Sequence, residues 1–395
     1  MEKRYNGTLL FALLSVMMFA LGLQVGGFNL VIAPVAEEYQ LSNTLMGSLA
    51  TFQYIAIMIA PIVFGGLSDR RGRKNVIVAF SLLFLAGCAF TLFIPSVAGF
   101  IAGVFLIGAG ASVTWGTISA ALGDAFGERA SKFINLSFCC YSLGAVVSPQ
   151  LIAFFTGSLG FDWRICYILT AAAVLVSLVI VLPLRFAPQP AGSPSAQHSG
   201  GGRFRHVGSV IFISLFLSMV LNCSIENGLT FFANSYFTDV VARPSLTSSA
   251  ISVYWLMMIP SRLLVGFLYK RRRTVLIASF ICMAALLLVI YATTNGSVAL
   301  VCMGAIGFAS GPLYSTLIGL TAEAFPSEAG TMTGLIVAGQ GIGGAASPFL
   351  MGVIADHMAV RSAYLMLALF GIIGAGAYLL YFFRARSAER QAALK

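Results

Sequence analysis

Residues 65–74 read GGLSDRRGRK, a short hydrophilic stretch between two long apolar runs. It holds one acidic residue, Asp69, and four cations within residues 70–74. Charged side chains are costly inside the hydrocarbon core, and cation-rich short loops lie on the cytoplasmic side of membrane proteins. The stretch therefore predicts a cytoplasmic loop, and it fixes the orientation of the segments on either side.

The composition indicates an integral membrane protein. Hydrophobic residues make up 59% of the 395 positions and charged residues 9%, whereas about a quarter of the residues in soluble domains are charged. A membrane helix needs about 20 apolar residues, so the chain has room for about twelve spans with short loops. Hydropathy predicts these spans near 8–34, 43–66, 75–95, 97–123, 131–157, 163–184, 207–237, 246–269, 274–294, 297–323, 330–355 and 361–383.

The net charge of +10 follows from 23 Lys and Arg against 13 Asp and Glu. Most of the cations fall in loops on one predicted side, so membrane topology explains them and no nucleic-acid partner is expected. Both termini are predicted to be cytoplasmic, in a multi-pass protein of the inner or plasma membrane. The seven cysteines lie in apolar stretches without metal-ligand spacing, and the three histidines are scattered. We therefore expect no metal site, no cofactor and no enzyme.

The chain reads as two related halves. Residues 185–206 are rich in Pro, Gly and Ser and are predicted to be a cytoplasmic linker between bundles at 1–184 and 207–395. A single offset pairs Gly108 with Gly307 and Gly144 with Gly343. One register held across such landmarks indicates a duplication related by an axis along the membrane normal.

The 65–74 stretch closely resembles the motif between helices 2 and 3 of the major facilitator superfamily of secondary transporters. The resemblance implies an all-α membrane protein with twelve transmembrane helices in two six-helix, pseudo-symmetric bundles. It also implies a monomer that moves a small-molecule solute through the lipid bilayer by alternating access. Glycine permits close helix approach and tight turns, and the acidic residue can cap a neighbouring helix or pair with arginine. The predicted gating residues are Gly65, Asp69, Arg70, Gly72 and Arg73.

Two charges lie within predicted spans, Glu226 in the seventh and Arg262 in the eighth. Intramembrane charges mark functional sites by default. Counting along the helices places the two residues at different depths, so no direct ion pair is predicted. Glu226 is the predicted proton-coupling residue, because a desolvated carboxyl can titrate near working pH.

The segment NCSIENGLTFFANSYF at 222–237, together with Trp255 and Arg262, resembles the fucose, galactose and glucose proton-symporter branch of the superfamily. This resemblance implies uptake of a sugar or sugar-like solute with protons. The sequence departs from the branch in spans one and four, which lack embedded carboxylates and offer Gln24, Asn29 and Trp115 instead.

Three other functions stay open. The position of Arg262, four residues before Gly266, resembles the position where monocarboxylate and oxalate carriers hold a carboxylate. This resemblance favours transport of an organic anion. Export of a drug or metabolite is the third transport function, although the chain has neither the span-four arginine nor the span-five Gly-Pro pair of proton-coupled drug exporters. A membrane sensor that binds a solute without moving it is the alternative outside transport.

Amide, hydroxyl and aromatic side chains suit a hydroxyl-rich ring, because they donate, accept and stack without requiring a charge. Asn227 and Asn234 are predicted to share one helix face, two turns apart. The predicted substrate-binding residues are Gln24, Asn29, Trp115, Tyr141, Asn222, Asn227, Asn234, Tyr236, Trp255, Arg262, Tyr314 and Gln340.

Overall fold

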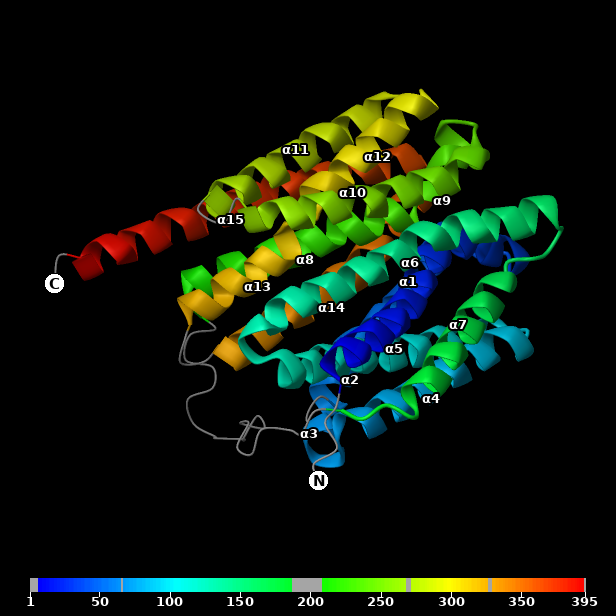
Figure 1. The fold of residues 1–395 in the computed structure, drawn as a ribbon. Helices are drawn as coiled ribbons and strands as arrows, with labels where there is room; N and C mark the ends of the chain where they lie inside the picture. The colour runs from blue at the N-terminus through cyan, green and yellow to red at the C-terminus, as the bar shows by residue number, and fades with distance from the viewer. Residues whose placement is uncertain (1–5, 65–66, 187–207, 268–270, 326–328, 394–395) are drawn as a thin grey trace. The chain divides into compact units, whose positions relative to one another are not determined.

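A computed structural model describes residues 6–64, 67–186, 208–267, 271–325 and 329–393. These residues form helices and no strand, as Figure 1 shows. The first half contains α1 (Gly7–Glu38), α2 (Asn43–Phe64), α3 (Leu67–Arg71), α4 (Arg73–Phe93), α5 (Val97–Phe126), η1 (Gly127–Arg129), α6 (Ala130–Ser158) and α7 (Ile165–Val181). The second half contains α8 (Val210–Phe231), α9 (Ala233–Ser235), η2 (Tyr236–Val240), η3 (Pro244–Leu246), α10 (Thr247–Phe267), α11 (Arg272–Ala292), α12 (Gly296–Ser310), α13 (Leu313–Ala324), α14 (Ala329–His357) and α15 (Val360–Ala393).

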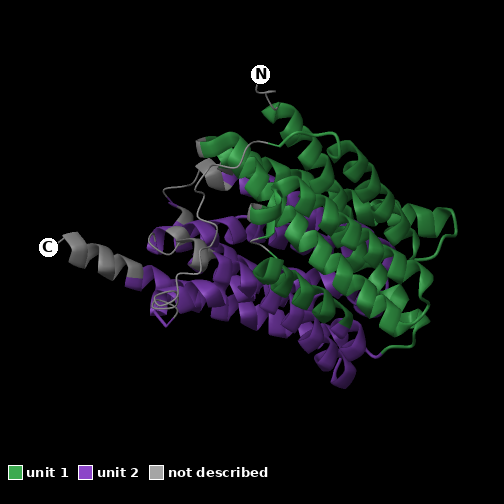
Figure 2. Cartoon of the chain, turned by 90° about the horizontal axis from the view of Figure 1, so that it is seen from below, with its two compact units in different colours: residues 1–41, 49–197 green, residues 42–48, 198–395 purple. Residues whose placement is uncertain are grey.

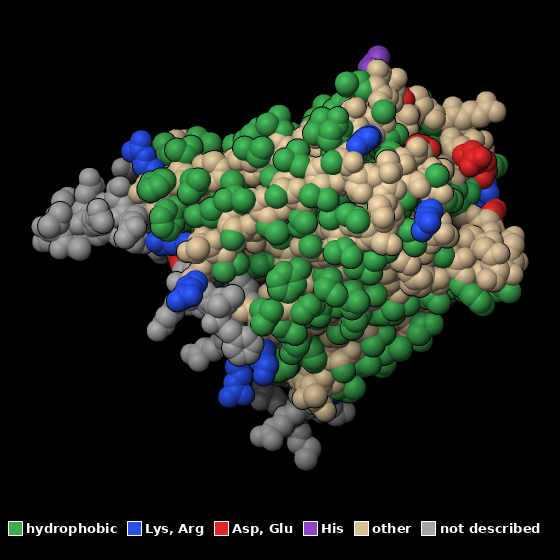
Figure 3. Space-filling model, turned by 90° about the horizontal axis from the view of Figure 1, so that it is seen from above, with side chains coloured by type: hydrophobic (Ala, Val, Ile, Leu, Met, Phe, Trp, Pro, Cys, Tyr) green, Lys and Arg blue, Asp and Glu red, His purple; other side chains and the backbone are tan. Residues whose placement is uncertain are grey.

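The predicted all-α membrane fold is confirmed. Ten segments of the described residues are long and apolar enough to cross a membrane, and Ile165–Val181 is a shorter apolar helix. Large hydrophobic side chains such as Ile62, Phe93 and Val301 are exposed, and Figure 3 shows hydrophobic side chains over much of the visible face. Such a surface is stable only in lipid or under another apolar cover.

Two predicted spans differ in detail from the helices observed. The seventh stops being regular after Phe231, where α8 ends and a short α9 and the π-helical turn η2 follow. The tenth is divided into α12 and α13 at Gly311 and Pro312, where proline removes a backbone donor. Hydropathy detects neither break, because the apolar composition continues across both.

The chain separates into two compact units, residues 1–41 with 49–197 and residues 42–48 with 198–395, coloured separately in Figure 2. The predicted linker lies outside the described residues except at 185–186. Residues 42–48, which the sequence assigns to the first bundle, belong to the second unit. The carboxylate of Asp356 accepts the backbone N–H groups of Asn43 and Thr44, both at 2.8 Å, and so caps the start of α2. A negative charge at a helix N-terminus is stabilising.

In the first unit, the backbones of α1 and α6 pack closely against each other, with glycines at the crossing. A Cβ added at Gly22 would lie 1.9 Å from the carbonyl oxygen of Tyr141, and one at Gly144 would lie 2.2 Å from that of Phe19. Small residues at such crossings are what allow membrane helices to pack by van der Waals contact. Glycine is therefore required here by close approach.

The second unit repeats this crossing between α8 and α14. A Cβ added at Gly343 would lie 2.3 Å from the carbonyl oxygen of Val220, which is the kind of contact that its repeat partner Gly144 makes in the first unit. Ser347 adds a hydrogen bond across the crossing, because its hydroxyl donates to the carbonyl oxygen of Ser224 at 2.7 Å. The repeat register read from the sequence thus pairs residues with the same packing role.

Replacing Gly22 by alanine is expected to lower the free energy of unfolding by about 1–3 kcal/mol, because the added methyl meets backbone that cannot move aside. Gly116 is the control, since a Cβ there meets nothing within 4 Å. Gly116→Ala should leave stability unchanged or raise it by about 0.5–1 kcal/mol through helix propensity. Thermal unfolding of the detergent-purified proteins measures both, and equal midpoints for the two variants would contradict the crossing described above.

Candidate functional site

A cluster of polar and aromatic side chains lies inside the second unit, which we call the Glu226 cluster: Asn222, Glu226, Tyr254, Arg262, Ser310 and Tyr314. Asn222 and Glu226 lie one turn apart on α8, so they share a helix face. Tyr254 and Arg262 come from α10, Ser310 ends α12, and Tyr314 belongs to the first turn of α13. Three spans of one unit therefore contribute to the cluster.

A chain of hydrogen bonds connects these helices. The Tyr254 hydroxyl donates to Ser310 Oγ at 3.4 Å, and the Ser310 hydroxyl donates to Asn222 Oδ1 at 3.5 Å. Asn222 is fully buried, and its Nδ2 amide has no oxygen or nitrogen acceptor in the described part of the chain. The Cys223 thiol beside it is a weak hydrogen-bond partner, so Asn222 is suited to a ligand that brings an oxygen acceptor.

Glu226 is half-buried and carries the negative charge of the cluster. The positive charge of Arg262 interacts electrostatically with it, and both charges act on Tyr254 and Tyr314. The depth count along the helices predicts no direct ion pair between them, and this stays a prediction.

Three other predicted residues follow along the same segment. The Asn227 amide donates to the Cys223 carbonyl oxygen at 2.7 Å, and Asn234 Oδ1 accepts from the Thr238 hydroxyl at 3.3 Å. The premise that Asn227 and Asn234 share one regular helix face is wrong, because α8 ends at Phe231. Tyr236 is buried, and its hydroxyl donates to the Ile290 carbonyl oxygen at 2.8 Å, which gives it a structural role at the end of α11.

The remaining predicted residues of the second unit are Trp255 and Gln340. The Trp255 ring meets that of Tyr254 edge to face, with centroids 5.7 Å apart, so it borders the Glu226 cluster. Gln340 is half-buried on α14. Their roles in solute binding stay predictions.

The first unit holds a second polar and aromatic group. Gln24 and Asn29 are buried on α1, and the Nε2 amide of Gln24 has no acceptor among the described residues. The rings of Trp115 on α5 and Tyr141 on α6 meet edge to face with centroids 6.0 Å apart. The structure thus brings Trp115 and Tyr141 together, as a shared site requires.

The stretch at 65–74, which we call the basic loop, has a defined structure around Arg73. Gly72 has φ of 85°, which favours glycine and agrees with the predicted tight turn. Arg73 Nε donates to Asp124 Oδ2 at 2.9 Å, and its Nη1 donates to Ser68 Oγ at 2.6 Å. Arg70 is exposed. Gly65 and the side chain of Asp69 lie outside the described residues.

Sequence reasoning missed the partners of these cations. The offset that pairs Gly108 with Gly307 also pairs Asp124 with Glu323, near the ends of spans four and ten. Nothing in the sequence pairs Asp124 with Arg73. A second charged cluster lies at the C-terminal end of α1, where Arg164 binds Glu38 at 2.6 Å and Asp162 at 2.9 Å. The hydrogen bond to Glu38 raises the pKa of Arg164, so this pair remains ionised at working pH.

Apolar spans, a charged pair inside them and a structured basic loop together define a multi-pass membrane transporter. The model of the Major Facilitator Superfamily matches residues 13–337 and 215–394. The chain belongs to this superfamily.

Several known proteins are similar to the chain. The Bacillus subtilis protein NiaP, named for niacin/nicotinamide transport, is 26% identical over 168 residues, which is 42% of this chain and 42% of NiaP. The chloramphenicol resistance protein CraA of Acinetobacter baumannii is 29% identical over 179 residues, which is 44% of this chain and 42% of CraA. The match therefore spans less than half the length of either relative.

The crystal structure of the nucleoside transporter NupG has the same fold. Its TM-score is 0.75 over 94% of this chain and 99% of that chain, at 14% sequence identity. Identity this low supports the fold and not the solute.

Asp124→Asn is expected to lower the free energy of unfolding by about 3 kcal/mol, because it removes the carboxylate that the Arg73 guanidinium binds in a site with little water. The side chains of this pair are 10% and 11% exposed. Asp162→Asn is the control, since Asp162 is 57% exposed in its pair with Arg164, and surface pairs contribute less than about 1 kcal/mol. Thermal unfolding compares the two variants. Equal losses of stability would show that the buried pair of Arg73 and Asp124 contributes no more than the exposed pair.

Proposed function

We propose that the chain is a secondary active transporter that takes up a small, uncharged, hydroxyl-bearing solute, sugar or sugar-like, together with protons. It would act in the inner or plasma membrane with both termini cytoplasmic. Alternating access follows from the family, and Asp69 in the basic loop would stabilise one state. The observation that carries the proposal is the Glu226 cluster.

The chemistry of the cluster favours a neutral polar solute. Asn222, Ser310 and Tyr254 supply donors and acceptors in one connected chain, and a solute hydroxyl can accept from the Asn222 amide and donate in return. Tyr254 and Trp255 offer ring surfaces beside these groups. When Glu226 is ionised, its charge offsets that of Arg262 and the cluster presents no net charge to the solute.

The proton-coupling role rests on the same interaction. A carboxyl among apolar and aromatic residues can exchange a proton. When it is protonated, Arg262 no longer has a negative charge beside it. Protonation of Glu226 removes the negative charge that offsets Arg262. Binding of a proton and binding of a solute are thereby linked through one pair of side chains.

The organic-anion function is the second candidate, and Arg262 is the observation that favours it. Once Glu226 is protonated, the guanidinium could hold a carboxylate in a bidentate manner. The similarity to NiaP, whose name refers to niacin, agrees with this alternative. The similarity to CraA keeps drug export as a third outcome of the same experiment.

Solute class is tested by thermal stabilisation of the purified protein with hexoses, deoxyhexoses, nicotinate and other small carboxylates, and amphipathic cations, since a bound ligand raises apparent stability. We expect a sugar to stabilise the wild type. Asn222→Ala should weaken its binding about tenfold through loss of one or two hydrogen bonds. Stabilisation by a carboxylate that Arg262→Ala abolishes would instead establish the organic-anion function, and stabilisation by cations alone would favour export.

Glu226→Gln is expected to abolish proton-driven accumulation in proteoliposomes, because an amide cannot exchange the proton. Binding and counterflow of solute should persist. Glu37→Gln is the control, since Glu37 is exposed near the end of α1 and its variant should accumulate solute as the wild type does. Full pH dependence of uptake in Glu226→Gln would refute the coupling role, and binding without any flux in the wild type would identify a sensor.

A further inference from the structure

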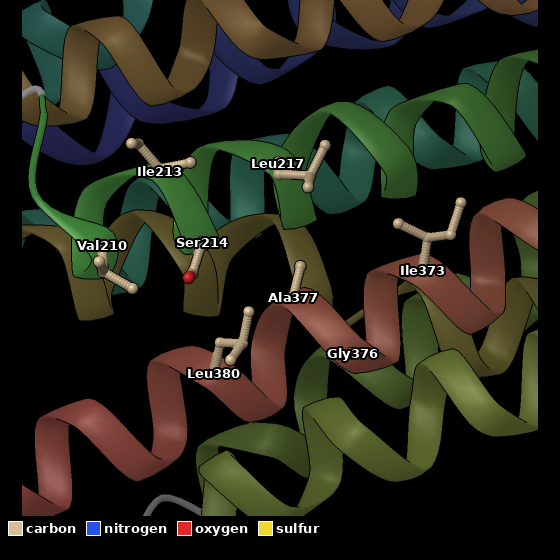
Figure 4. A pocket seen from close by; sticks show the side chains of 8 residues that line it. All are labelled: Val210, Ile213, Ser214, Leu217, Ile373, Gly376, Ala377 and Leu380. Atoms are coloured by element: carbon tan, nitrogen blue, oxygen red, sulfur yellow. The ribbon is translucent and has the colours of Figure 1, made fainter.

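An apolar groove runs between α8 and α15 in the second unit, with a volume of about 400 Å³. Figure 4 shows the residues that line it, with Val210 and Ser214 of α8 facing Ala377 and Leu380 of α15 across the hollow. The lining residues are Val210, Ile213, Ser214, Leu217, Ile373, Gly376, Ala377 and Leu380. The groove is separate from the Glu226 cluster, which lies further along α8.

Small residues create the hollow. The two helices run antiparallel here, since the direction from Val210 to Leu217 along α8 is the direction from Leu380 back to Ile373 along α15 (Figure 4). Gly376 and Ala377 leave room between them, and a Cβ added at Gly376 would meet nothing within 4 Å. Ile213 and Leu380 on the two rims are 51% and 56% exposed. The hollow is thus open to its surroundings and lies within two candidate spans.

The described residues of the second unit leave the hollow uncovered, so a lipid chain of the bilayer can enter it. A dry apolar hollow binds apolar ligands. In lipid the gain in free energy comes from closer packing of the chain against the lining. An acyl chain fits the shape and the chemistry of the lining, whereas a polar solute does not.

One end of the groove is positively charged. Arg384 is exposed and follows Leu380 on α15 by one helical turn. Val210 is the first residue of α8, so the positive end of that helix dipole lies at the same end of the groove. The sequence predicts this end to be cytoplasmic. A phosphate at the level of Arg384 would interact with both positive groups while its chain lies along the groove.

We propose that this groove is a binding site for an anionic phospholipid of the cytoplasmic leaflet, with an acyl chain against Gly376 and Ala377 and the headgroup phosphate at Arg384. The apolar lining selects a chain, and the cation selects a negative headgroup. The site is independent of the transported solute, because no residue of the Glu226 cluster lines it.

Native mass spectrometry of the full chain, with equal amounts of phosphatidylglycerol and phosphatidylcholine added to the detergent micelle, tests the proposal. The wild type should retain one phosphatidylglycerol with about tenfold preference, the ratio expected from one charge-assisted contact. Arg384→Gln should reduce that preference to parity. Gly376→Phe and the smaller Gly376→Leu should remove the bound lipid by filling the groove.

Two matched controls keep the outcome specific. Gly157→Phe adds the same side chain at an exposed glycine of α6 with open space around it, and Arg185→Gln removes an exposed arginine after α7. Both should bind lipid as the wild type does. Equal binding of the two lipids by the wild type would overturn the headgroup assignment, and unchanged lipid binding in both folded Gly376 variants would overturn the groove.

Discussion

Backbone-to-backbone contact between helices is the constraint on which each unit depends. Within a membrane, lipid chains are as apolar as leucine, so helices are held by packing and by polar contacts between them. The glycines at the α1–α6 and α8–α14 crossings remove the side chains that would otherwise separate the backbones. The hydrogen bond from Ser347 to the Ser224 carbonyl oxygen then fixes the second crossing in rotation as well as in distance.

This packing determines which residues meet in the Glu226 cluster. Gly307 on α12 lies against the Tyr254 carbonyl oxygen, which sets the register between α10 and α12 and brings the Tyr254 hydroxyl to Ser310. The α8–α14 crossing fixes the rotation of α8 and hence the face that carries Asn222 and Glu226. Gly108 has the same relation to the Gln53 carbonyl oxygen in the first unit. The two halves therefore share the packing frame, while the polar side chains on that frame differ.

The sequence predicts the spans and the repeat well, because both depend on composition and on glycine and proline, which act locally. It also identifies Glu226 and Arg262, since a charge in an apolar run is visible without a structure. It could not give the electrostatic interaction between them, because that depends on how α8 and α10 pack. Ser310 and Asp124 were missed for the same reason: a serine in an apolar helix and an aspartate at a helix end acquire meaning only from a neighbour distant in sequence. The irregular turn after Phe231, which separates Asn227 from Asn234, leaves no mark in hydropathy.

Arg262 lowers the cost of an ionised Glu226 inside the spans, because the two side chains carry opposite charges. An isolated charge in a low-dielectric region is unstable, and a pair is tolerated only when each charge offsets the other. Replacing such a pair with apolar residues would often stabilise a protein, so stability alone does not account for it. Protonation of Glu226 would give the same site two charge states. The pair is neutral overall when Glu226 is ionised and positive when it is protonated. The proposed proton coupling would use that difference, because a solute and a proton can influence each other only through a group whose interactions change with both.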